Sequence, residues 1–501
     1  MTTFRWGDPA DAVTLSLSVR DLLSSALGVT GPRPAAEPVL PEPAPLPDFP
    51  GLDVSAAARL RHAAGMSTED LLTARGGAVP DAPDGVARPS SHEDVLEVLR
   101  LAAEHRIAVV PQGGRTSVVG GLRAVRDGYA GVVALDLSGL DKLLRLDRTS
   151  RTATFEAGIR GPRAEELLNA EGFTLGHFPQ SFQYATLGGF AATRSSGQAS
   201  AGYGRFDQMV VGLRAATGAG TLDLGRAPQS AAGPDLRQLM LGSEGAFGVL
   251  TELTVRIRPQ CELSYAGWAF PSFEAGMRAV RALAQDGPLP AVLRLSDEAE
   301  TAINAATGSG AEAGGGCLAI VGHLEEAHPA EQLKAYGGEP LGAEPGRVWA
   351  AGRFRAPYLR DALLDAGALA ETLETATFWD RLPETYAAVR DALVGTLGAG
   401  GTPPIVMCHI SHVYETGASL YFTVVAAQAE DPVAQWRAAK VAAGEAIVAS
   451  GATISHHHGV GRDHRPWYAE EIGPVGVAVL QAVKRAMDPH DVLNPGILLP
   501  W

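Results

Sequence analysis

The chain has 501 residues, and the apolar 46% of them is scattered in runs too short to cross a bilayer. Its 56 acidic and 41 basic residues give a net charge of −15, the wrong sign for a protein that tracks nucleic-acid phosphates. Cys261, Cys317 and Cys408 lie far apart, which suits a reducing compartment and offers no thiolate metal site. The first residues lack the basic-then-apolar order of a secretory signal, so we expect a cytoplasmic protein of two or three domains.

A proline-rich stretch, residues 32–50, divides the N-terminal part of the chain. It holds eight prolines in nineteen positions, which predicts an extended, semi-rigid connector rather than a packed element. From Val86 onwards the proline-rich composition gives way to a pattern of helices, strands and glycine turns. We therefore assign residues 1–85 to an N-terminal segment with a proline-rich linker.

Residues 86–258 show the pattern of an α+β domain rich in glycine turns. The stretch SSHEDVLEVLRLAAEHRIAVVPQGG carries apolar residues at helical spacing, then a short apolar strand, then a glycine turn. Strands are predicted at GVVALDLSGL and TATFEAGI, followed by a helix from Arg163 to Glu171. Glycine-rich turns then continue up to Arg258.

Beyond Pro259 the glycine loops thin out and a second α+β domain begins. Helices such as FEAGMRAVRALAQ alternate with apolar strands such as GCLAIVGHL and ASLYFTVVAA. We assign residues 259–450 to this domain and residues 451–501 to a C-terminal segment. No internal repeat is evident.

The loop PQGGRTSVVGGL, Pro111 to Leu122, follows an apolar strand and exposes successive backbone N–H groups. Such a loop binds a phosphate without needing lysine, although paired glycines after a strand also make ordinary tight turns. It has neither the Gly-Lys-Ser/Thr of a Walker loop nor GxGxxG spacing. Nucleotide hydrolysis is therefore disfavoured.

Three more segments follow this loop in order: HFPQSFQYATLGGFAATRSSGQ, YGRFDQMVVGLRAATGAGTL and LMLGSEGAFGVLTELTVRIRP. Together the four resemble the FAD-binding domain of the vanillyl-alcohol oxidase and p-cresol methylhydroxylase superfamily, and DPHDVLNPG resembles its C-terminal return to that domain. Within the superfamily, the sequence most resembles the alkyldihydroxyacetonephosphate synthase family, and the resemblance covers most of the chain. The motifs that carry it are RWGDP, RLSD, YLRD, ETATFWDRL, YETGASLYF and SHHHGVGR.

The resemblance implies an α+β architecture: a two-subdomain FAD-binding fold of the vanillyl-alcohol oxidase type in residues 86–258, and a cap domain for substrate in residues 259–450. The C-terminal segment would return to the FAD domain. Flavin contacts would come from the loops of residues 111–117, 180–186, 193–196 and 242–248. The implied cofactor residues are Pro111, Gln112, Gly113, Gly114, Arg115, Thr116, Ser117, Gln180, Ser181, Thr186, Gly188, Gly189, Thr193, Arg194, Ser195, Ser196, Gly242, Ser243, Glu244, Gly245 and Gly248.

The physical chemistry of these loops agrees with that role, because glycines let the backbone approach a pyrophosphate. Short hydroxyl donors would come from Ser117, Thr186, Thr193 and Ser195. Glu244 fits two alternatives, a partner of the cofactor's sugar or ring, or a buried glutamate that bonds its own loop.

The FAD should be non-covalent, because the first loop lacks the histidine to which some superfamily members attach it. The sequence departs from the family pattern at three places. Arg115 stands where a third glycine is common, Gln180 where aspartate is frequent, and His409 where an arginine is usual.

His456, His457 and His458 stand side by side before two glycines. Neighbouring side chains cannot all face one ligand, and no carboxylate lies at a zincin-like spacing, so we expect no metal. The alternatives are packing and catalysis. The family resemblance implies that this run is critical for activity on the substrate side of the flavin.

Tyr421 corresponds to the general acid/base tyrosine of the family, although a tyrosine in an apolar strand is ordinarily core. Because a phenol titrates near 10, we expect an imidazolium of the histidine run to assist it, across the flavin. Arg294 and Arg360 correspond to positions important for activity and substrate contact, and a guanidinium suits phosphate or carboxylate.

The resemblance implies that this enzyme exchanges the acyl group of acyl-dihydroxyacetone phosphate for a fatty alcohol through a flavin adduct. The alternative is an FAD-dependent oxidase or dehydrogenase of a 2-hydroxy acid or related alcohol, and a third hypothesis is a binding protein that keeps FAD for stability. The expected partner is a small-molecule substrate that bears a phosphate or a carboxylate, and a lipid tail on it is possible. A homodimer is expected, and peripheral membrane contact stays open.

Overall fold

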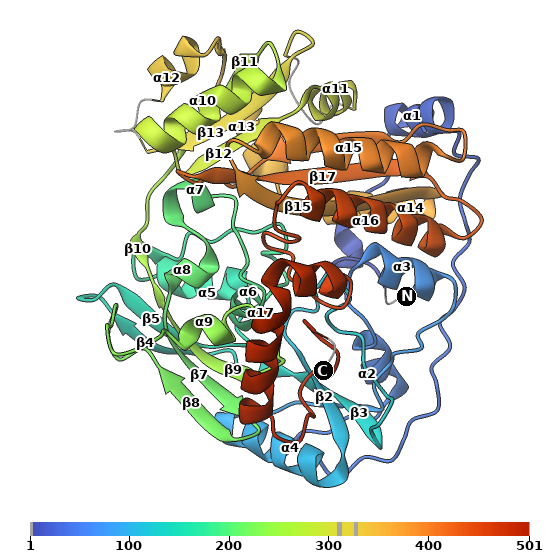
Figure 1. The fold of residues 1–501 in the computed structure, drawn as a ribbon, viewed down its shortest axis with the longest axis vertical. Coiled ribbons are helices and arrows are strands. Elements are labelled where there is room, and N and C mark those ends of the chain that lie inside the picture. The colour runs from blue at the N-terminus through green and yellow to red at the C-terminus, as the bar shows by residue number, and fades with distance from the viewer. Residues whose placement is uncertain (1–3, 308–312, 325–328, 500–501) are drawn as a thin grey trace.

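The computed structural model describes residues 4–307, 313–324 and 329–499. Its elements form two halves stacked along the long axis (Figure 1). The lower half contains a three-stranded and a five-stranded sheet built by residues 85–256, a two-stranded sheet pairs residues 173–174 with residues 258–259, and the upper half contains one seven-stranded sheet built by residues 264–427. Among the described residues, no helix combines the length and apolar character needed to cross a membrane.

The smaller sheet of the lower half is parallel and carries the first glycine loop. Its strands lie in the order β1 (Gly85–Ala87), β3 (Gly131–Asp136), β2 (Ile107–Gln112). Helix α4 (His92–His105) precedes β2. The α4 helix begins where the Ser91 side chain accepts a hydrogen bond from the Asp94 N–H, and its apolar face is buried. The predicted helix, strand and turn are therefore confirmed here.

The larger sheet of the lower half is antiparallel, in the order β4-β5-β9-β7-β8. Helix α5 spans Gly161–Asn169 rather than the predicted 163–171, because Pro162 fits the first helical turn and starts the helix earlier. The other elements are β4 (Leu143–Asp147), β5 (Thr152–Glu156), β6 (Phe173–Thr174), α6 (Leu187–Ala192), α7 (Ser200–Tyr203), α8 (Phe206–Met209), β7 (Val210–Thr217), β8 (Gly220–Leu224), α9 (Arg237–Met240), β9 (Val249–Arg256) and β10 (Arg258–Pro259).

The upper half is built on a sheet in the order β14-β11-β13-β12-β16-β17-β15. Its two longest strands, β15 (Ala368–Phe378) and β17 (Gly417–Ala427), pair antiparallel along their whole length, and α15 and α16 cover one face of them (Figure 1). The remaining elements are β11 (Ser264–Phe270), α10 (Phe273–Asp286), β12 (Val292–Ser296), α11 (Glu298–Ala306), β13 (Cys317–His323), α12 (Ala330–Ala335), β14 (Glu339–Gly342), α13 (Glu344–Gly352), α14 (Ala356–Asp365), α15 (Leu382–Gly398), β16 (Ile405–Ile410) and α16 (Pro432–Ala449).

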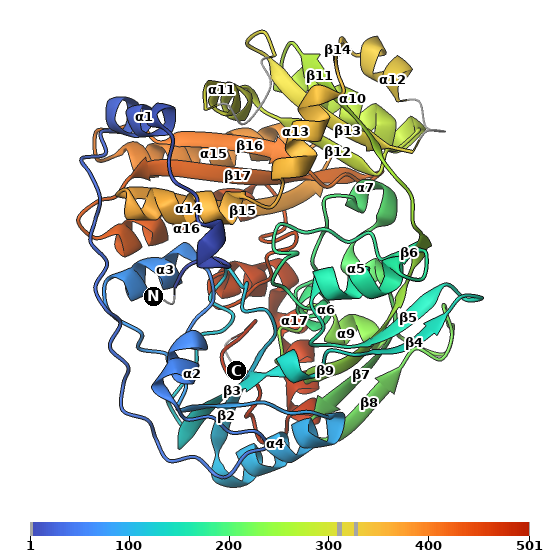
Figure 2. The ribbon, with the colours of Figure 1, turned by 180° about the vertical axis from the view of Figure 1, so that it is seen from behind.

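The two ends of the chain join the halves. Helix α1 (Leu17–Leu27) packs on the upper half, and residues 28–50 then run without a helix down one side to the level of α4 (Figure 2). Helices α2 (Ala56–Arg61) and α3 (Thr68–Arg75) follow. At the other end, α17 (Arg465–Met487), kinked at Gly473 and Pro474, packs against the core of the lower half. The boundaries assigned to the four segments stay predictions.

Candidate active site

A cavity of about 660 Å³ lies between the two halves and is lined by residues from both. Most of the predicted cofactor residues line it. They are Pro111, Gln112, Gly113, Gly114, Arg115, Thr116, Ser117, Gln180, Ser181, Thr186, Gly188, Gly189, Thr193, Ser195, Ser196, Ser243, Glu244, Gly245 and Gly248. Arg294, Arg360, Tyr421, His457 and His458 line the same cavity from the upper half and the C-terminal segment. The fold therefore brings the four loops and the predicted catalytic side chains to one space.

Three predicted site residues do not line this cavity: Arg194, Gly242 and His456. The Arg194 guanidinium is turned to the Leu241 and Gln238 carbonyls and to Asp207. Gly242 donates its N–H to the Ala191 carbonyl. These contacts hold the loops around residues 193–196 and 242–248 together, so we correct Arg194 and Gly242 from lining to supporting positions.

The first glycine loop packs on the second loop at van der Waals distance. A Cβ at Gly114 would lie 2.1 Å from the Tyr184 carbonyl oxygen, and one at Gly113 would lie 2.2 Å from Thr186 Oγ1. Both glycines are therefore required by loop packing, in addition to the cofactor approach that the sequence suggested. The two loops are positioned by each other.

The polar atoms that face the cavity from these loops fit an anionic cofactor. Among the described residues, no protein acceptor bonds the backbone N–H groups of Gly114, Thr116 or Ser117. The Gln180 side-chain nitrogen is buried without a hydrogen-bond partner in the protein. Buried donors without partners are costly, and the pyrophosphate of FAD offers the acceptors that they lack. The residues present therefore fit FAD.

Several of the predicted hydroxyl donors already have protein partners. The Thr193 hydroxyl donates to the Gly189 carbonyl, and Thr186 Oγ1 accepts the Gly189 N–H at the start of α6. Ser195 Oγ lies 3.1 Å from Nε2 of His177. These hydroxyls shape the loops, and backbone N–H groups supply much of the free hydrogen-bonding capacity.

Arg115 adopts a left-handed backbone conformation with φ of 59°. Its Nη1 lies 3.0 Å from Nε2 of His62, whose Nδ1 lies 2.8 Å from the Ala58 carbonyl oxygen. A carbonyl accepts only, so Nδ1 donates to it, and Nε2 lies between the Arg115 guanidinium and the Asp136 carboxylate, 3.2 Å from Asp136 Oδ2. The bulky side chain at this family departure is thus accommodated by a neighbour from α2 and its C-cap.

Glu244 connects the fourth loop to the C-terminal segment. Its carboxylate accepts the N–H groups of Val460 and Gly461 at 2.9 Å. Neither sequence alternative for Glu244 included this partner. Burial raises the pKa of Glu244 to about 7, although the two N–H donors oppose the shift. Glu244 therefore fixes the loop that follows the histidine run.

The histidine run is held by one buried carboxylate, Glu374 of β15. Glu374 accepts the backbone N–H groups of His456, His457 and His458 at 2.7 to 3.1 Å. Burial alone would raise the pKa of Glu374, but attraction to the neighbouring imidazoles in their protonated form, together with the backbone donors, lowers it below its ordinary value. Burial lowers the pKa of all three imidazoles, that of His458 to about 4. The resting imidazoles are therefore neutral.

His456 lies behind the cavity wall together with His412, a residue that the sequence did not single out. Potential ligand atoms of His412, His456 and His457 all lie within 4.8 Å of one another. The run itself supplies two of the three, as expected from directions of neighbouring side chains. Three neutral imidazoles match the ligand type of a zinc site, so the expectation of no metal stays a prediction that needs a measurement.

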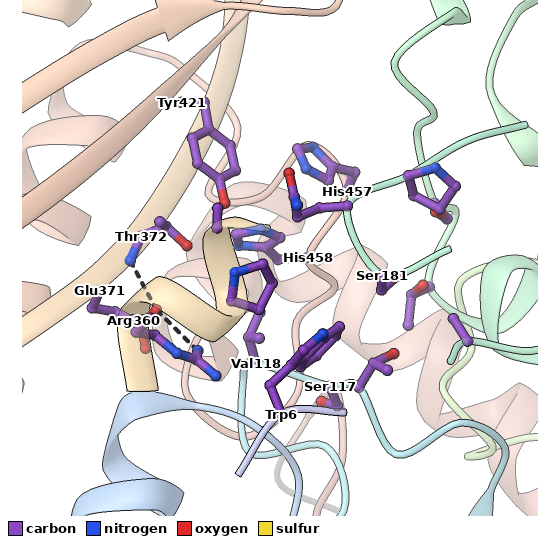
Figure 3. A pocket seen from close by; sticks show the side chains of 18 of the residues that line it. Trp6, Ser117, Val118, Ser181, Arg360, Glu371, Thr372, Tyr421, His457 and His458 are labelled. Carbon is purple, nitrogen blue, oxygen red and sulfur yellow. Dashed lines mark hydrogen bonds and ion pairs between the residues drawn. The ribbon is translucent and has the colours of Figure 1, made fainter. Parts of the chain in front are cut away.

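Tyr421 points into the cavity from β17 toward Thr372 and His458 (Figure 3). Its ring stacks on His409 at 4.8 Å and lies 6.0 Å from the His457 ring. Two expectations are wrong here. The first is that Tyr421 and the histidine run lie on opposite sides of the flavin. An isoalloxazine ring does not fit between rings that are this close, so Tyr421 and the histidines lie on the same side of it. Burial raises the Tyr421 pKa to about 12, and the neutral imidazoles supply no cation.

Arg360 of α14 lies beside Glu371 in the cavity wall (Figure 3). Its Nη1 donates to the Met66 carbonyl at 2.8 Å and is 3.9 Å from the Glu371 carboxylate. Its Nε and Nη2 atoms are buried without a hydrogen-bond partner in the protein. Two unpaired donors on one guanidinium match the two oxygens of a phosphate or carboxylate.

Arg294 has its charge compensated inside the protein. Its Nη2 lies 2.8 Å from Glu300 Oε1 and 2.9 Å from Nδ1 of His409. Burial and the Arg294 charge lower the pKa of His409, so this family departure adds no positive charge. Of the two predicted arginines, Arg360 is the one with donors that are buried without a hydrogen-bond partner in the protein.

The remaining wall of the cavity is apolar and was not predicted residue by residue. Helix α1 contributes Val19 and Leu23, and Trp6 lines the cavity near Ser117 (Figure 3). Trp6 belongs to the RWGDP stretch that carried part of the family resemblance. The sequence did not reveal the place of helix α1 in this wall, because its partners β16, β17 and α14 lie hundreds of residues away in the chain.

Known proteins match the chain over both halves. Residues 83–224 match the family described as "FAD binding domain", and residues 261–498 match the family described as "FAD linked oxidases, C-terminal domain". The chain is 33% identical over 479 residues to the alkyldihydroxyacetonephosphate synthase of Trypanosoma brucei brucei, covering 89% of this chain and 78% of that protein.

Solved structures agree with this assignment. An alkyldihydroxyacetonephosphate synthase structure superposes with a TM-score of 0.85 at 28% identity, covering 98% of both chains. A p-cresol methylhydroxylase structure superposes with a TM-score of 0.62 at 14% identity, covering 89% of this chain and 93% of that chain, a likeness of fold alone. The predicted fold class and the FAD cofactor are confirmed. The chain belongs to the alkyldihydroxyacetonephosphate synthase family of FAD-dependent enzymes.

Proposed function

We propose that the protein exchanges the acyl group of acyl-dihydroxyacetone phosphate for a fatty alcohol. The observation that carries the proposal is Arg360, whose two unpaired buried donors await an anion in a cavity that also holds Tyr421 and an apolar wall. The family membership of the chain supports the same reaction. A 2-hydroxy acid oxidoreductase would use the anion site but has no need of a long apolar wall.

Bound FAD would supply the electrophilic and nucleophilic ring on which the exchange takes place. The loops around residues 111–117 and 180–189 would hold its pyrophosphate with backbone N–H groups. Arg360 would bind the substrate phosphate through Nε and Nη2. With its pKa at about 12, Tyr421 is a neutral phenol at pH 7, so its first role would be to donate a hydrogen bond to the departing carboxylate.

The alkyl tails would lie against an apolar cluster between α1, α14 and β15–β17. Leu15, Leu23, Leu363, Met407 and Val425 are buried in this cluster and line the cavity. Burying a tail there is favourable by about 0.8 kcal/mol per methylene. The cluster therefore supports a lipid-like substrate.

The outer end of this wall carries exposed apolar side chains. Leu17 of α1 is 80% exposed, and Leu359 of α14, which lines the cavity, is 37% exposed. We propose that this end contacts the apolar surface from which a lipid substrate arrives. The cytoplasmic location and the homodimer also stay proposals.

The test is to mix the FAD-loaded protein anaerobically with each substrate class. Acyl-dihydroxyacetone phosphate and a fatty alcohol should yield an ether product and free fatty acid with no net flavin reduction. A panel of 2-hydroxy acids should leave the flavin oxidised. Lasting flavin bleaching by a hydroxy acid, with no ether product, would replace the proposal with the oxidoreductase alternative. A flavin inert to both classes would favour the binding protein.

A further inference from the structure

Behind the cavity wall, three side chains form a continuous line of hydrogen bonds toward the surface. Nδ1 of His457 lies 2.9 Å from Nδ1 of His456, and Nε2 of His456 lies 2.6 Å from the Tyr414 hydroxyl. His457 lines the cavity, whereas His456 is buried behind it. We propose that His457, His456 and Tyr414 conduct the proton released in turnover from the cavity to the surface. This inference rests on the proposed function.

The overall reaction requires such an exit. A C–O bond to the fatty acid breaks and a C–O bond to the alcohol oxygen forms, with no change in electron count. The alcohol O–H bond also breaks. Because the fatty acid leaves as a carboxylate at neutral pH, each turnover leaves one proton in the cavity. Bound FAD and substrate would occupy that cavity and displace the water that would otherwise carry the proton.

His456, the middle residue of the line, is able to pass a proton on. Both ring nitrogens of His456 are in the line, so it can accept a proton at one and release a proton at the other. Among the described residues, Nε2 of His457 has no hydrogen-bond partner, which leaves it available on the cavity side. For outward transfer, His457 donates from Nδ1 to His456, and His456 donates from Nε2 to Tyr414.

Charges along the line favour transfer. The Glu374 carboxylate lies 3.5 Å from Nδ1 of His457 and stabilises a transient imidazolium. At the outer end, burial raises the pKa of the Tyr414 hydroxyl to about 12, and the neighbouring Arg205 guanidinium opposes part of that shift. Arg205 also donates to the His456 carbonyl at 3.2 Å, which fixes the register of the two segments.

The line ends at the turn between β16 and β17. Tyr414 is partly exposed there, and its neighbours Glu415 and Thr416 are exposed. His412 stays outside the line, because Ser196 and Ser200 occupy its Nδ1 at 3.0 and 2.7 Å. Its ring stacks on His456 at 4.9 Å and holds that ring in position. Tyr414 does not itself line the cavity, so its hydroxyl can be removed without deleting a lining side chain.

The test uses Tyr414→Phe in the FAD-loaded full chain, with Tyr203→Phe as the matched control. The Tyr203 hydroxyl bonds Cys261 outside the cavity lining. For Tyr414→Phe we expect normal FAD content and melting temperature, an unchanged KM, and kcat lower by about tenfold or more. The solvent deuterium isotope effect on kcat should rise, and added imidazole should restore part of the rate. The control should match the wild type in each.

Wild-type kcat and isotope effect in Tyr414→Phe would overturn the proposal. A loss of kcat that imidazole does not restore would also overturn it, because it indicates a structural role. Nitrogen-15 NMR of the histidines in the resting protein needs no substrate and separates this inference from the proposed function. The substitution removes the hydrogen bond at Nε2 of His456, so it should shift the nitrogen signals of His456 whichever substrate the enzyme uses, and an unchanged His456 signal would contradict the line.

Discussion

At the scale of single residues, burial decides the protonation states in the cavity. Tyr421 stays a phenol because burial raises its pKa to about 12, and His457 stays neutral because burial lowers its pKa. The same desolvation leaves two donors of Arg360 unpaired until an anion arrives. The site therefore combines neutral side chains that can carry protons with Arg360, a cation whose donors can bind an anion.

Tyr421→Phe removes one hydroxyl and keeps the stacking on His409. FAD content and melting temperature should be near those of the wild type, whereas turnover should fall by roughly 10² to 10⁴, the usual contribution of positioned proton transfer. The measurement is steady-state ether formation beside FAD absorbance and thermal unfolding. Full turnover in this variant would remove Tyr421 from the mechanism.

Chelation tests the three imidazoles of His412, His456 and His457, whose potential ligand atoms lie within 4.8 Å of one another. If these rings act as proton carriers, dialysis against a strong chelator should leave activity and FAD content unchanged. Metal analysis of the protein before dialysis is the control. Stoichiometric zinc whose removal abolishes turnover would show that the cluster is a metal site.

At the scale of elements, the cofactor loops are positioned by contacts with one another and with the C-terminal segment. The loop after β2 packs on the loop before α6, and the loop after α9 holds the segment that follows the histidine run. Changes in these contacts should therefore affect FAD retention even where no cofactor atom is touched.

Gly114→Val should abolish FAD retention, because the new Cβ would lie 2.1 Å from the Tyr184 carbonyl oxygen and force the two loops apart. Gly395→Val in α15 is the control, since nothing lies within 4 Å of a Cβ there. The measurement is FAD per polypeptide after gel filtration. Wild-type occupancy in Gly114→Val would mean that the two loops need not touch.

Glu244→Gln should alter how stability depends on pH in the FAD-free protein. Burial raises the Glu244 pKa from 4.5 to about 7, so the folded state binds this proton more tightly than the unfolded state. Its contribution is present below pH 4.5 and is lost as pH rises through about 7, a loss of about 3 kcal/mol at 1.36 kcal/mol per pKa unit.

The measurement is the melting temperature of both proteins across this range. The wild type should lose melting temperature relative to Glu244→Gln as pH rises from 4.5 to 7, and the difference should stay constant above that range. A pH-independent difference would contradict the raised pKa.

At the scale of the whole molecule, the cavity exists because distant segments meet. Its polar end comes from the lower half and the C-terminal segment, and its apolar wall comes from the upper half together with α1. The reacting atoms would lie where the two meet.

Leu363→Trp should narrow the cavity along its apolar wall, because Leu363 is buried in that wall. Overpacking of this kind costs about 1 to 3 kcal/mol of stability. We expect kcat/KM for a long-chain fatty alcohol to fall by about tenfold or more, and that for a short-chain alcohol to change little. Leu236→Trp on the surface is the control. Equal losses for both alcohols would place the tail elsewhere.

The sequence by itself determined the fold class and the FAD cofactor, because the motifs of the family lie in local stretches of chain with glycines at turns and apolar periodicity. The resemblance of those motifs to the family also pointed to Tyr421, Arg360 and the histidine run, whose roles stay predictions. The helix α5 boundary shifted only by the local effect of Pro162.

Only the tertiary structure decided which groups are charged, paired or free. The Glu374 carboxylate reaches the histidine run across 82 to 84 residues of chain, Glu244 reaches Gly461 across 217, and His412 joins His456 through ring stacking. Desolvation and hydrogen-bond partners set these properties, and both depend on which distant segments pack together. The sequence therefore placed Tyr421 at the site, whereas the packing of β15, β17 and the C-terminal segment put it beside the histidines and kept it neutral.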